Sequence, residues 1–261
     1  MSGPIWSLET GSDPLVATAI HAGGSIRNEL LDYLAIDADD RRREEDPFTD
    51  RWTDVAANRV VVDASRFEVD LNRPREKAVY LSPEDAWGLK VWNRELPGRM
   101  VKASLMEYDN FYRDMAKLFS ALHAKYGCFV VFDVHSYNHR RGGPDAPPAS
   151  IEENPAVNVG TGTMLERSRF APVIACFIET LSTVEFPTGG LDVRENVKFR
   201  GGQFARWVHA TFPGSACVLS VEFKKFFMDE WTGEADAHLV NAIRDALAAC
   251  VSPVLSALET I

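Results

Sequence analysis

Cysteine is scarce in this sequence of 261 residues, which has only four: Cys128, Cys176, Cys217 and Cys250. Gaps of 48, 41 and 33 positions separate them along the chain. That spacing matches neither a zinc knuckle nor a disulfide framework. Three of the four lie in apolar segments, so we expect buried free thiols, a reducing compartment and a cytoplasmic protein.

Positive charge is also in short supply. Lys and Arg number 28 against 38 Asp and Glu, which gives a formal net charge of −10. Nucleic acids and anionic membranes are bound by basic faces, so we expect neither as a partner. No uninterrupted apolar run approaches the roughly 18 residues that span a bilayer. Residues 1–13 have no basic and no apolar signal region, so we expect no signal peptide.

What the sequence does contain is an ordinary globular composition, with 46% hydrophobic and 25% charged residues. This balance allows a sizeable core and argues against disorder. No repeat, low-complexity stretch or clear boundary divides the chain. The length therefore predicts a single domain over residues 1–261.

Strand and helix patterns alternate along the chain. Five apolar runs, most of them continuous as in strands covered on both faces, predict buried strands at residues 15–21, 59–64, 128–135, 173–178 and 217–223. Helices are predicted at 26–34, 50–57, 83–92, 100–125, 204–211 and 239–258, the last interrupted near Pro253. Loops are predicted at 37–46, 140–150 and 186–200. The alternation predicts an α/β fold, a three-layer sandwich with a mixed, largely parallel central sheet.

Two histidines end predicted strands. His21 closes LVATAI before Ala-Gly-Gly-Ser, and His135 closes CFVVFDV before Ser-Tyr-Asn-His. Ligands bind at the carboxyl ends of the strands of such a sheet, so these side chains are placed for a metal ion or for proton transfer. For either one alone, a strand-end histidine bonded to a carbonyl is the alternative. Their shared setting favours one common site.

A third candidate is Glu222, inside the apolar segment CVLSVEFKKFF. A carboxylate there carries a desolvation cost unless it is paired. Lys224 or Lys225 would serve as an ion-pair partner. A glutamate whose pKa is raised by burial is also what a general base beside an activated water needs.

Two polar segments complete the candidates. RFEVDLNR at 66–73 alternates apolar and polar residues, which predicts a half-buried strand that ends in an arginine suited to bind a carboxylate. A solvated charge cluster is the alternative there. EEDPFTD at 44–50 is either a solvated loop or the source of an oxygen ligand for a His/His/carboxylate zinc site. Glu29, on the helix after His21, competes for that ligand role.

Together these segments resemble the N-formylglutamate amidohydrolase family, which is related in fold to the zinc carboxypeptidases. The resemblance runs over most of the chain. It consists, in order, of His21-Ala-Gly, Glu44-x-Asp46 with Asp50, RFEVDLNR at 66–73, FDVHS at 132–136, FRGGQFAR at 199–206 and SVEFKKFFMDE at 220–230. The segment 76–92 is peculiar to a subgroup.

The resemblance implies a zinc ion held by His21, Asp46 and His135, with Glu29 and Glu45 left open as the acidic ligand. It implies Glu222 as general base. It also implies that Asn72 and Arg73 bind a substrate carboxylate and that Arg200 adds a second cation. The expected partner is then a small acidic molecule, and the oligomeric state is unknown.

The expected reaction is hydrolysis of the amide bond of an N-formyl or N-acyl amino acid. Two other functions remain open at this point. One is a zinc carboxypeptidase-like enzyme that acts on a peptide or cell-wall amide with the same residues. The other is a carboxylate-binding module without catalysis, which keeps Arg73 and needs neither the metal nor Glu222.

Overall fold

The centre of the protein is a mixed sheet. The computed structural model describes residues 4–261. Residues 1–3, which begin the segment expected to contain no signal peptide, lie outside the described part. The sheet has the order β1-β3-β2-β4-β7-β5-β6. Its strands are β1 (Trp6–Glu9), β2 (Leu15–Ala19), β3 (Asn58–Val62), β4 (Phe129–Tyr137), β5 (Val157–Gly160), β6 (Val193–Glu195) and β7 (Ala216–Lys224).

The four central strands, β3, β2, β4 and β7, run parallel. β1 pairs antiparallel with β3 at one side, and the parallel pair β5 and β6 joins β7 antiparallel at the other. Within the register, His135 of β4 lies directly beside Glu222 of β7. These two candidate residues, which the sequence places in separate predicted strands, are therefore neighbours.

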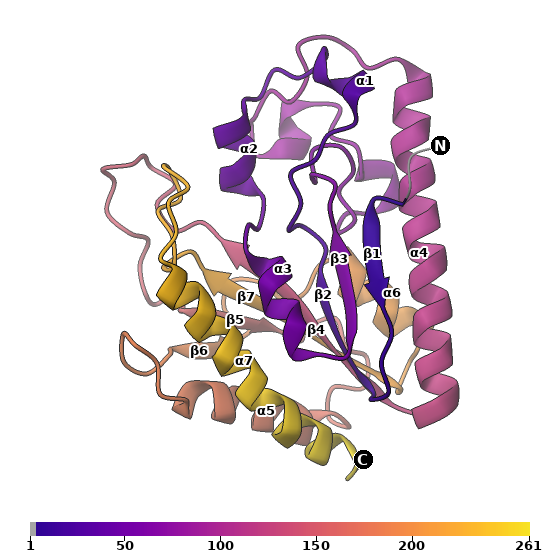
Figure 1. The fold of residues 1–261 in the computed structure, drawn as a ribbon, viewed down its shortest axis with the longest axis vertical. Helices are drawn as coiled ribbons and strands as arrows, with labels where there is room; N and C mark the ends of the chain where they lie inside the picture. Colours follow the sequence, from indigo (N-terminus) through magenta and orange to yellow (C-terminus); the bar gives the residue numbers. More distant parts are fainter. Residues whose placement is uncertain (1–3) are drawn as a thin grey trace.

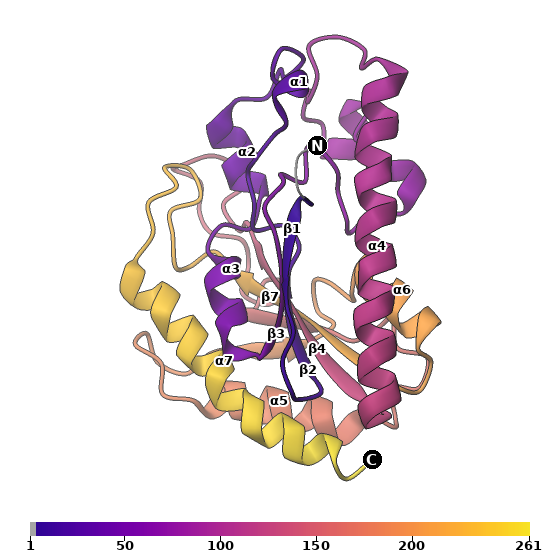
Figure 2. The ribbon, with the colours of Figure 1, turned by 45° about the vertical axis from the view of Figure 1, so that its right-hand side comes forward.

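Helices cover both faces of the sheet (Figures 1 and 2). α4 (Gly98–Tyr126) and α6 (Gln203–Thr211) lie on one face, and α3 (Thr49–Trp52), α5 (Ala171–Thr183) and α7 (Ala237–Leu258) lie on the other. The short helices α1 (Asn28–Leu31) and α2 (Ala38–Glu44) lie beyond the sheet at the top of both views. The result is the three-layer α/β sandwich that the sequence predicts.

Alternation along the strands explains the two core layers. Successive side chains of a strand point to opposite faces, so Val130 and Phe132 of β4 pack with α5 and α7, while Phe129 and Val131 pack with α4 and α6. Because both faces are covered, every residue of β4 is buried. This burial produces the continuous apolar runs in the sequence.

Most of the predicted elements are present, but the strand predicted at 173–178 is wrong. These residues lie in α5, whose buried positions recur at helical spacing: Val173, Ile174, Phe177 and Leu181. A short apolar run cannot distinguish a strand from a buried helix. The sheet is instead extended by β1, β5 and β6, which have only four, four and three residues. β6 also divides the loop predicted at 186–200.

Several local predictions were also wrong. Residues 66–73 form turns rather than a half-buried strand, and the loop predicted at 37–46 contains α2, which begins with Asp37 accepting a hydrogen bond from the amide of Asp40. The helix predicted at 83–92 is a single 3-10 turn, Pro83–Ala86. α7 continues through Pro253 without interruption. Its apolar face packs against α5 and the sheet, which outweighs the cost of one proline.

Among residues 4–261, one helix, α7, is long and apolar enough to cross a membrane by length and composition alone. No uninterrupted apolar run of this length was found in the sequence, because Arg244 and Asp245 interrupt this one. The mean hydropathy of an 18-residue window tolerates these two charges. One side of α7 is buried in the main core. This is the usual arrangement of a core helix in a globular domain.

Candidate metal centre and its cavity

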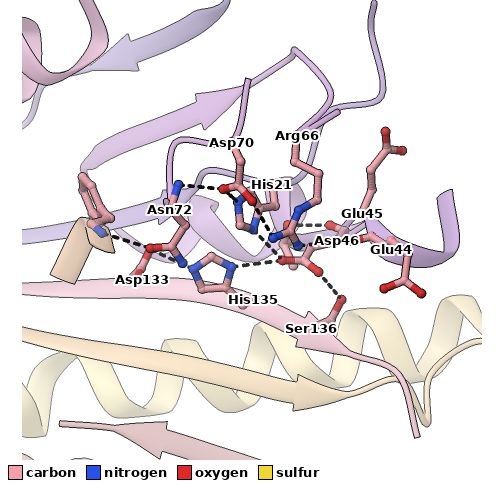
Figure 3. A network of polar contacts seen from close by, with 12 residues as sticks. His21, Glu44, Glu45, Asp46, Arg66, Asp70, Asn72, Asp133, His135 and Ser136 are labelled. Carbon is pink, nitrogen blue, oxygen red and sulfur yellow. Dashed lines mark hydrogen bonds and ion pairs between the residues drawn. The ribbon is translucent and has the colours of Figure 1, made fainter. Parts of the chain in front are cut away.

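Three predicted ligands meet where parallel strands end (Figure 3). His21 follows β2, His135 lies near the carboxyl end of β4, and Asp46 follows α2. One ligand atom from each lies within 4.8 Å of the others, and all three residues are buried. The Nδ1 atoms of His135 and His21 lie 3.0 Å and 3.5 Å from Oδ2 of Asp46. The two histidine side chains therefore converge on one carboxylate.

Each histidine lies beside a second buried carboxylate on the side away from Asp46. Nε2 of His21 lies 2.8 Å from Oδ1 of Asp70, and Nε2 of His135 lies 3.2 Å from Oδ1 of Asp133. This leaves both Nδ1 atoms directed at Asp46 (Figure 3). A carboxylate on the far nitrogen is the usual way in which a protein orients a metal-binding histidine.

The residues fit a divalent cation for two reasons. Two imidazole nitrogens and one carboxylate oxygen are a ligand set of catalytic zinc sites. In addition, the three buried carboxylates Asp46, Asp70 and Asp133 lie around the two imidazoles, and among the described residues only Asp70 of these three is also ion-paired to arginine. Burial alone would lower the pKa of His135, yet Asp133 and Asp46 raise it well above its ordinary value. A cation between the Nδ1 atoms would balance the same negative charge.

Asp46 is fixed by its neighbours on three sides. Its amide donates to the carbonyl of His21 at 2.9 Å, and Oγ of Ser136 donates to its Oδ1 at 3.3 Å. Although burial works in the opposite direction, the hydrogen bonds from His135 and His21 hold the pKa of Asp46 well below its usual range. The buried Lys225 donates through Nζ to the carbonyls of Arg43 and Glu45 and so ties this segment to the end of β7.

The two competing acidic residues lie elsewhere. Glu29 is exposed on α1, and Glu45 is buried with its carboxylate accepting a hydrogen bond from Oγ of Ser65. Neither belongs to the cluster of possible ligands among the described residues. The structure therefore brings Asp46, rather than Glu29 or Glu45, to His21 and His135.

Glu222 shares a cavity with this cluster. The cavity has a volume of about 470 Å³ and is lined by His21, Asp46, His135 and Glu222. Burial raises the pKa of Glu222 to about 8; the charge of His135 lowers it, and those of Asp46 and Asp133 raise it. Among the described residues neither Lys225 nor Lys224 forms an ion pair with Glu222; the ammonium group of Lys225 donates to two carbonyls, and that of Lys224 donates to the carbonyl of Asn154. A carboxyl group with this pKa is able to take up and release a proton near neutral pH.

The predicted carboxylate-binding residues line the same cavity. Asn72, Arg73 and Arg200 all contribute to its wall. Oδ1 of Asn72 accepts a hydrogen bond from the amide of Phe204 at 2.9 Å, so α6 fixes the Asn72 side chain and leaves its NH₂ group available to a ligand. Gly202 is needed here because a Cβ atom would clash with the Asn72 amide.

The cavity is rich in positive charge. Its lining includes the cations Arg66, Arg73, Arg141, Lys198, Arg200, Arg206 and Lys225. Against a chain of net charge −10, this concentration of cations is local. Such a cavity attracts small anions that the protein as a whole repels.

Several residues of the site were missed from the sequence. Asp133 carried a usable signal, because it lies two positions before His135 and residues i and i+2 of a strand share a face. Asp70 and Arg66 lie inside the quoted segment 66–73 but were assigned to a strand. Only the turns of the folded segment direct Asp70 to His21 and bring Nη2 of Arg66 to 2.8 Å from Asp70.

The fold and the cavity first define a class: an α/β protein with a candidate metal centre where its parallel strands end. The model of the N-formylglutamate amidohydrolase family matches residues 13–225. The chain belongs to this family. Membership indicates an amidohydrolase that acts on a non-peptide amide bond of a small molecule.

Two solved structures show the same fold. An N-formylglutamate amidohydrolase from Ralstonia eutropha JMP134 matches with a TM-score of 0.72 and 15% identity, over 98% of this chain and 99% of that chain. A gene product of Agrobacterium tumefaciens matches with a TM-score of 0.67 and 18% identity, over 98% and 97%. A metallo-carboxypeptidase from Burkholderia cenocepacia matches with a TM-score of 0.39 and 17% identity, over 94% and 56%. No curated protein matches the sequence.

Proposed function

We propose that this protein is a cytoplasmic, zinc-dependent hydrolase that cleaves the amide bond of an N-formyl or N-acyl amino acid of the N-formylglutamate type. The family supports the amide chemistry. The observation that carries the finer proposal is the single cavity in which His21, Asp46 and His135 face Glu222 beside Arg73. Residues 1–261 act as one domain in this proposal.

The metal would be held by Nδ1 of His21, Nδ1 of His135 and a carboxylate oxygen of Asp46. When bound, it supplies Lewis acidity toward the amide carbonyl and lowers the pKa of water toward about 7. Asp70 and Asp133 keep the two imidazoles in one orientation from the opposite side.

Glu222 moves the proton. Its carboxylate takes a proton from the attacking water and delivers it to the nitrogen of the leaving amine. Its place beside His135 in the sheet puts it at the edge of the cluster without making it one of the possible ligands. This step needs a carboxyl group with a raised pKa, and burial raises the pKa of Glu222.

Arg73, Asn72 and Arg200 bind the free carboxylate groups of the substrate. A guanidinium group forms two parallel hydrogen bonds with a carboxylate, which fixes the distance from that carboxylate to the scissile carbonyl. Arg66 supplies positive charge beside the cluster, where oxyanion character develops in the transition state. Ion pairing to Asp70 holds its guanidinium in place.

The direct test is a substrate panel for the purified, zinc-loaded protein. The panel contains N-formyl-L-glutamate, N-acetyl-L-glutamate, the same formyl compound with its α-carboxylate capped as an amide, and a dipeptide that ends in glutamate. We expect hydrolysis of formyl or acyl amino acids with a free carboxylate and weak activity on the capped compound. Hydrolysis of the dipeptide alone would contradict the proposal, and equal rates on capped and free compounds would contradict the carboxylate-binding role.

A further inference from the structure

Trp87 is an exposed tryptophan in the wall of the catalytic cavity. Its residue exposure is 45%, and it lines the cavity together with Arg66 and Arg73. It follows the 3-10 turn Pro83–Ala86, whose first residues are fixed by reciprocal hydrogen bonds between Ser82 and Asp85. The function proposed above assigns it no task.

The backbone of Trp87 is left-handed, with φ 54° and ψ 27°. This conformation is uncommon for a bulky residue and is maintained only where the surroundings enforce it. Gly88 follows with φ 92°, so the chain makes two consecutive left-handed steps here. The turn therefore directs an indole ring toward the cavity at an energetic cost.

The ring contacts the two arginines that matter most in the proposed reaction. The guanidinium carbon of Arg66 lies 4.9 Å from the ring centroid of Trp87, and that of Arg73 lies 5.6 Å from it. The ring of Tyr80 lies 5.9 Å from Trp87 and 5.9 Å from the Arg73 guanidinium. Trp87 and Tyr80 thus form an aromatic surface beside Arg73.

Arg73 has few other contacts that would hold it. Unlike Arg66, its guanidinium group forms no hydrogen bond to another residue of the described chain, and its one ion pair, to Asp70, is long at 3.8 Å. Its side chain is 37% exposed. Stacking on an aromatic ring leaves the N–H edge of a guanidinium group free to bind a carboxylate.

We propose that Trp87 is a positioning residue: it holds the Arg73 guanidinium in the orientation that binds the substrate carboxylate. This inference rests on the proposed function, which makes Arg73 the carboxylate anchor. Trp87 acts through Arg73 rather than by touching the substrate. Loss of the ring therefore weakens carboxylate binding and leaves the proton transfer by Glu222 unchanged.

The test is calorimetric binding of N-formyl-L-glutamate to zinc-loaded protein that carries Glu222→Gln, which greatly slows turnover during the titration. We expect Trp87→Ala and Trp87→Leu each to raise Kd about fivefold to thirtyfold, the range expected for a partly desolvated cation–π contact. Trp87→Phe should restore most of the affinity. Leu81→Ala, an exposed apolar residue outside this cavity, is the matched control and should leave Kd unchanged.

The Arg73→Ala background separates the possible results. If Trp87 acts through Arg73, Trp87→Ala adds nothing to the loss that Arg73→Ala causes. An equal further loss in that background would show that Trp87 acts through Arg66 or the ligand itself rather than through Arg73, and would overturn the positioning role. Unchanged Kd for Trp87→Ala, with a raised Kd for Arg73→Ala, would overturn the inference alone. Unchanged Kd for Arg73→Ala would overturn the carboxylate anchor itself and the inference with it.

In the otherwise unmodified enzyme, the same variants give a kinetic readout. We expect Trp87→Ala to raise KM for N-formyl-L-glutamate by a similar factor with kcat retained. A matching fall in kcat with KM unchanged would overturn the proposal, because it would place Trp87 in the chemical step.

Discussion

Glu222 is the residue on which the proposed chemistry depends most. Its carboxyl group lies in an apolar strand beside His135, and burial raises its pKa to about 8. A bound cation in the neighbouring cluster would act in the opposite direction. The site thus contains one carboxyl group that exchanges protons, Glu222, and two that remain charged because their pKa values are lowered, Asp46 and Asp70.

Replacement of Glu222 by glutamine tests the proton-transfer role. The amide retains size and hydrogen bonding but accepts no proton from water. We expect kcat to fall by about 10²–10⁴-fold, the usual contribution of general acid–base catalysis, with zinc content unchanged. The protein should still fold, because a neutral amide carries no charge to desolvate. Most of the turnover retained in a zinc-loaded Glu222→Gln protein would show that the residue is structural.

Arg73 offers a second test at the residue level. Arg73→Lys keeps the charge but removes the planar pair of donors, so we expect KM for free-acid substrates to rise by about tenfold, the effect of one lost charged hydrogen bond. Arg75→Lys is the control, since Arg75 is exposed and bonds only Asp109 outside the cavity. Steady-state kinetics of both variants would settle the role, and equal KM values would contradict it.

Among the elements, β4 carries both a candidate ligand and the residue that orients it. Asp133 and His135 share one face of this strand, and Asp133 also accepts hydrogen bonds from Thr18 of β2 and Ser220 of β7. Three parallel strands are thus joined at the base of the site. This arrangement makes the orientation of His135 a property of the sheet rather than of a loop.

We therefore expect Asp133→Asn to lower zinc affinity by about 10–100-fold, the usual cost of losing such an orienting carboxylate. Competition with a chromophoric chelator measures this affinity. Asp114→Asn, on the surface of α4, is the matched control. Equal zinc affinity in wild type and Asp133→Asn would contradict the role of Asp133 in orienting His135.

The contact between α6 and β7 depends on a neutral histidine. Nε2 of His209 accepts a hydrogen bond from the amide of Val218 at 3.0 Å, and Nδ1 lies 2.9 Å from Oγ1 of Thr163. Burial lowers the pKa of His209 to about 4, from an ordinary value of 6.5. The unfolded chain therefore binds more protons between these values, and the stability from neutral His209 is present above pH 6.5 and lost as pH falls toward 4.

His209→Gln should remove this pH dependence, because glutamine offers an acceptor to the Val218 amide and does not titrate. We expect the wild type to lose up to about 3 kcal/mol more than the variant between pH 7 and pH 4. Urea unfolding at several pH values measures the difference. His238→Gln, at an exposed position of α7, is the control. Parallel stability curves for wild type and His209→Gln would contradict the role of burial.

The sequence predicts the central part of the sheet and the long helices well, because their periodicity reflects packing on both faces. It fails where an element is too short to show a period, as in β1 and β6, or where an apolar run fits two structures, as in α5. The candidate ligands were recognisable from strand ends and family resemblance. Asp70 and Trp87 were not, because turns between residues 66 and 88 place them, and turn geometry depends on contacts distant in the chain.

At the scale of the whole molecule, an acidic protein is proposed to act on an acidic substrate. The formal net charge is −10, so the overall field opposes the approach of a carboxylate. The cations that line the cavity provide attraction at short range, and the buried carboxylates at the same site provide the negative charge that a divalent cation needs.

Elemental analysis of the purified protein is the decisive test of whether this site holds a catalytic zinc ion. We predict about one zinc per chain in the wild type. We also predict almost none in the His21→Ala, His135→Ala double variant, with the fold confirmed by circular dichroism. Full zinc occupancy in that double variant would contradict the claim.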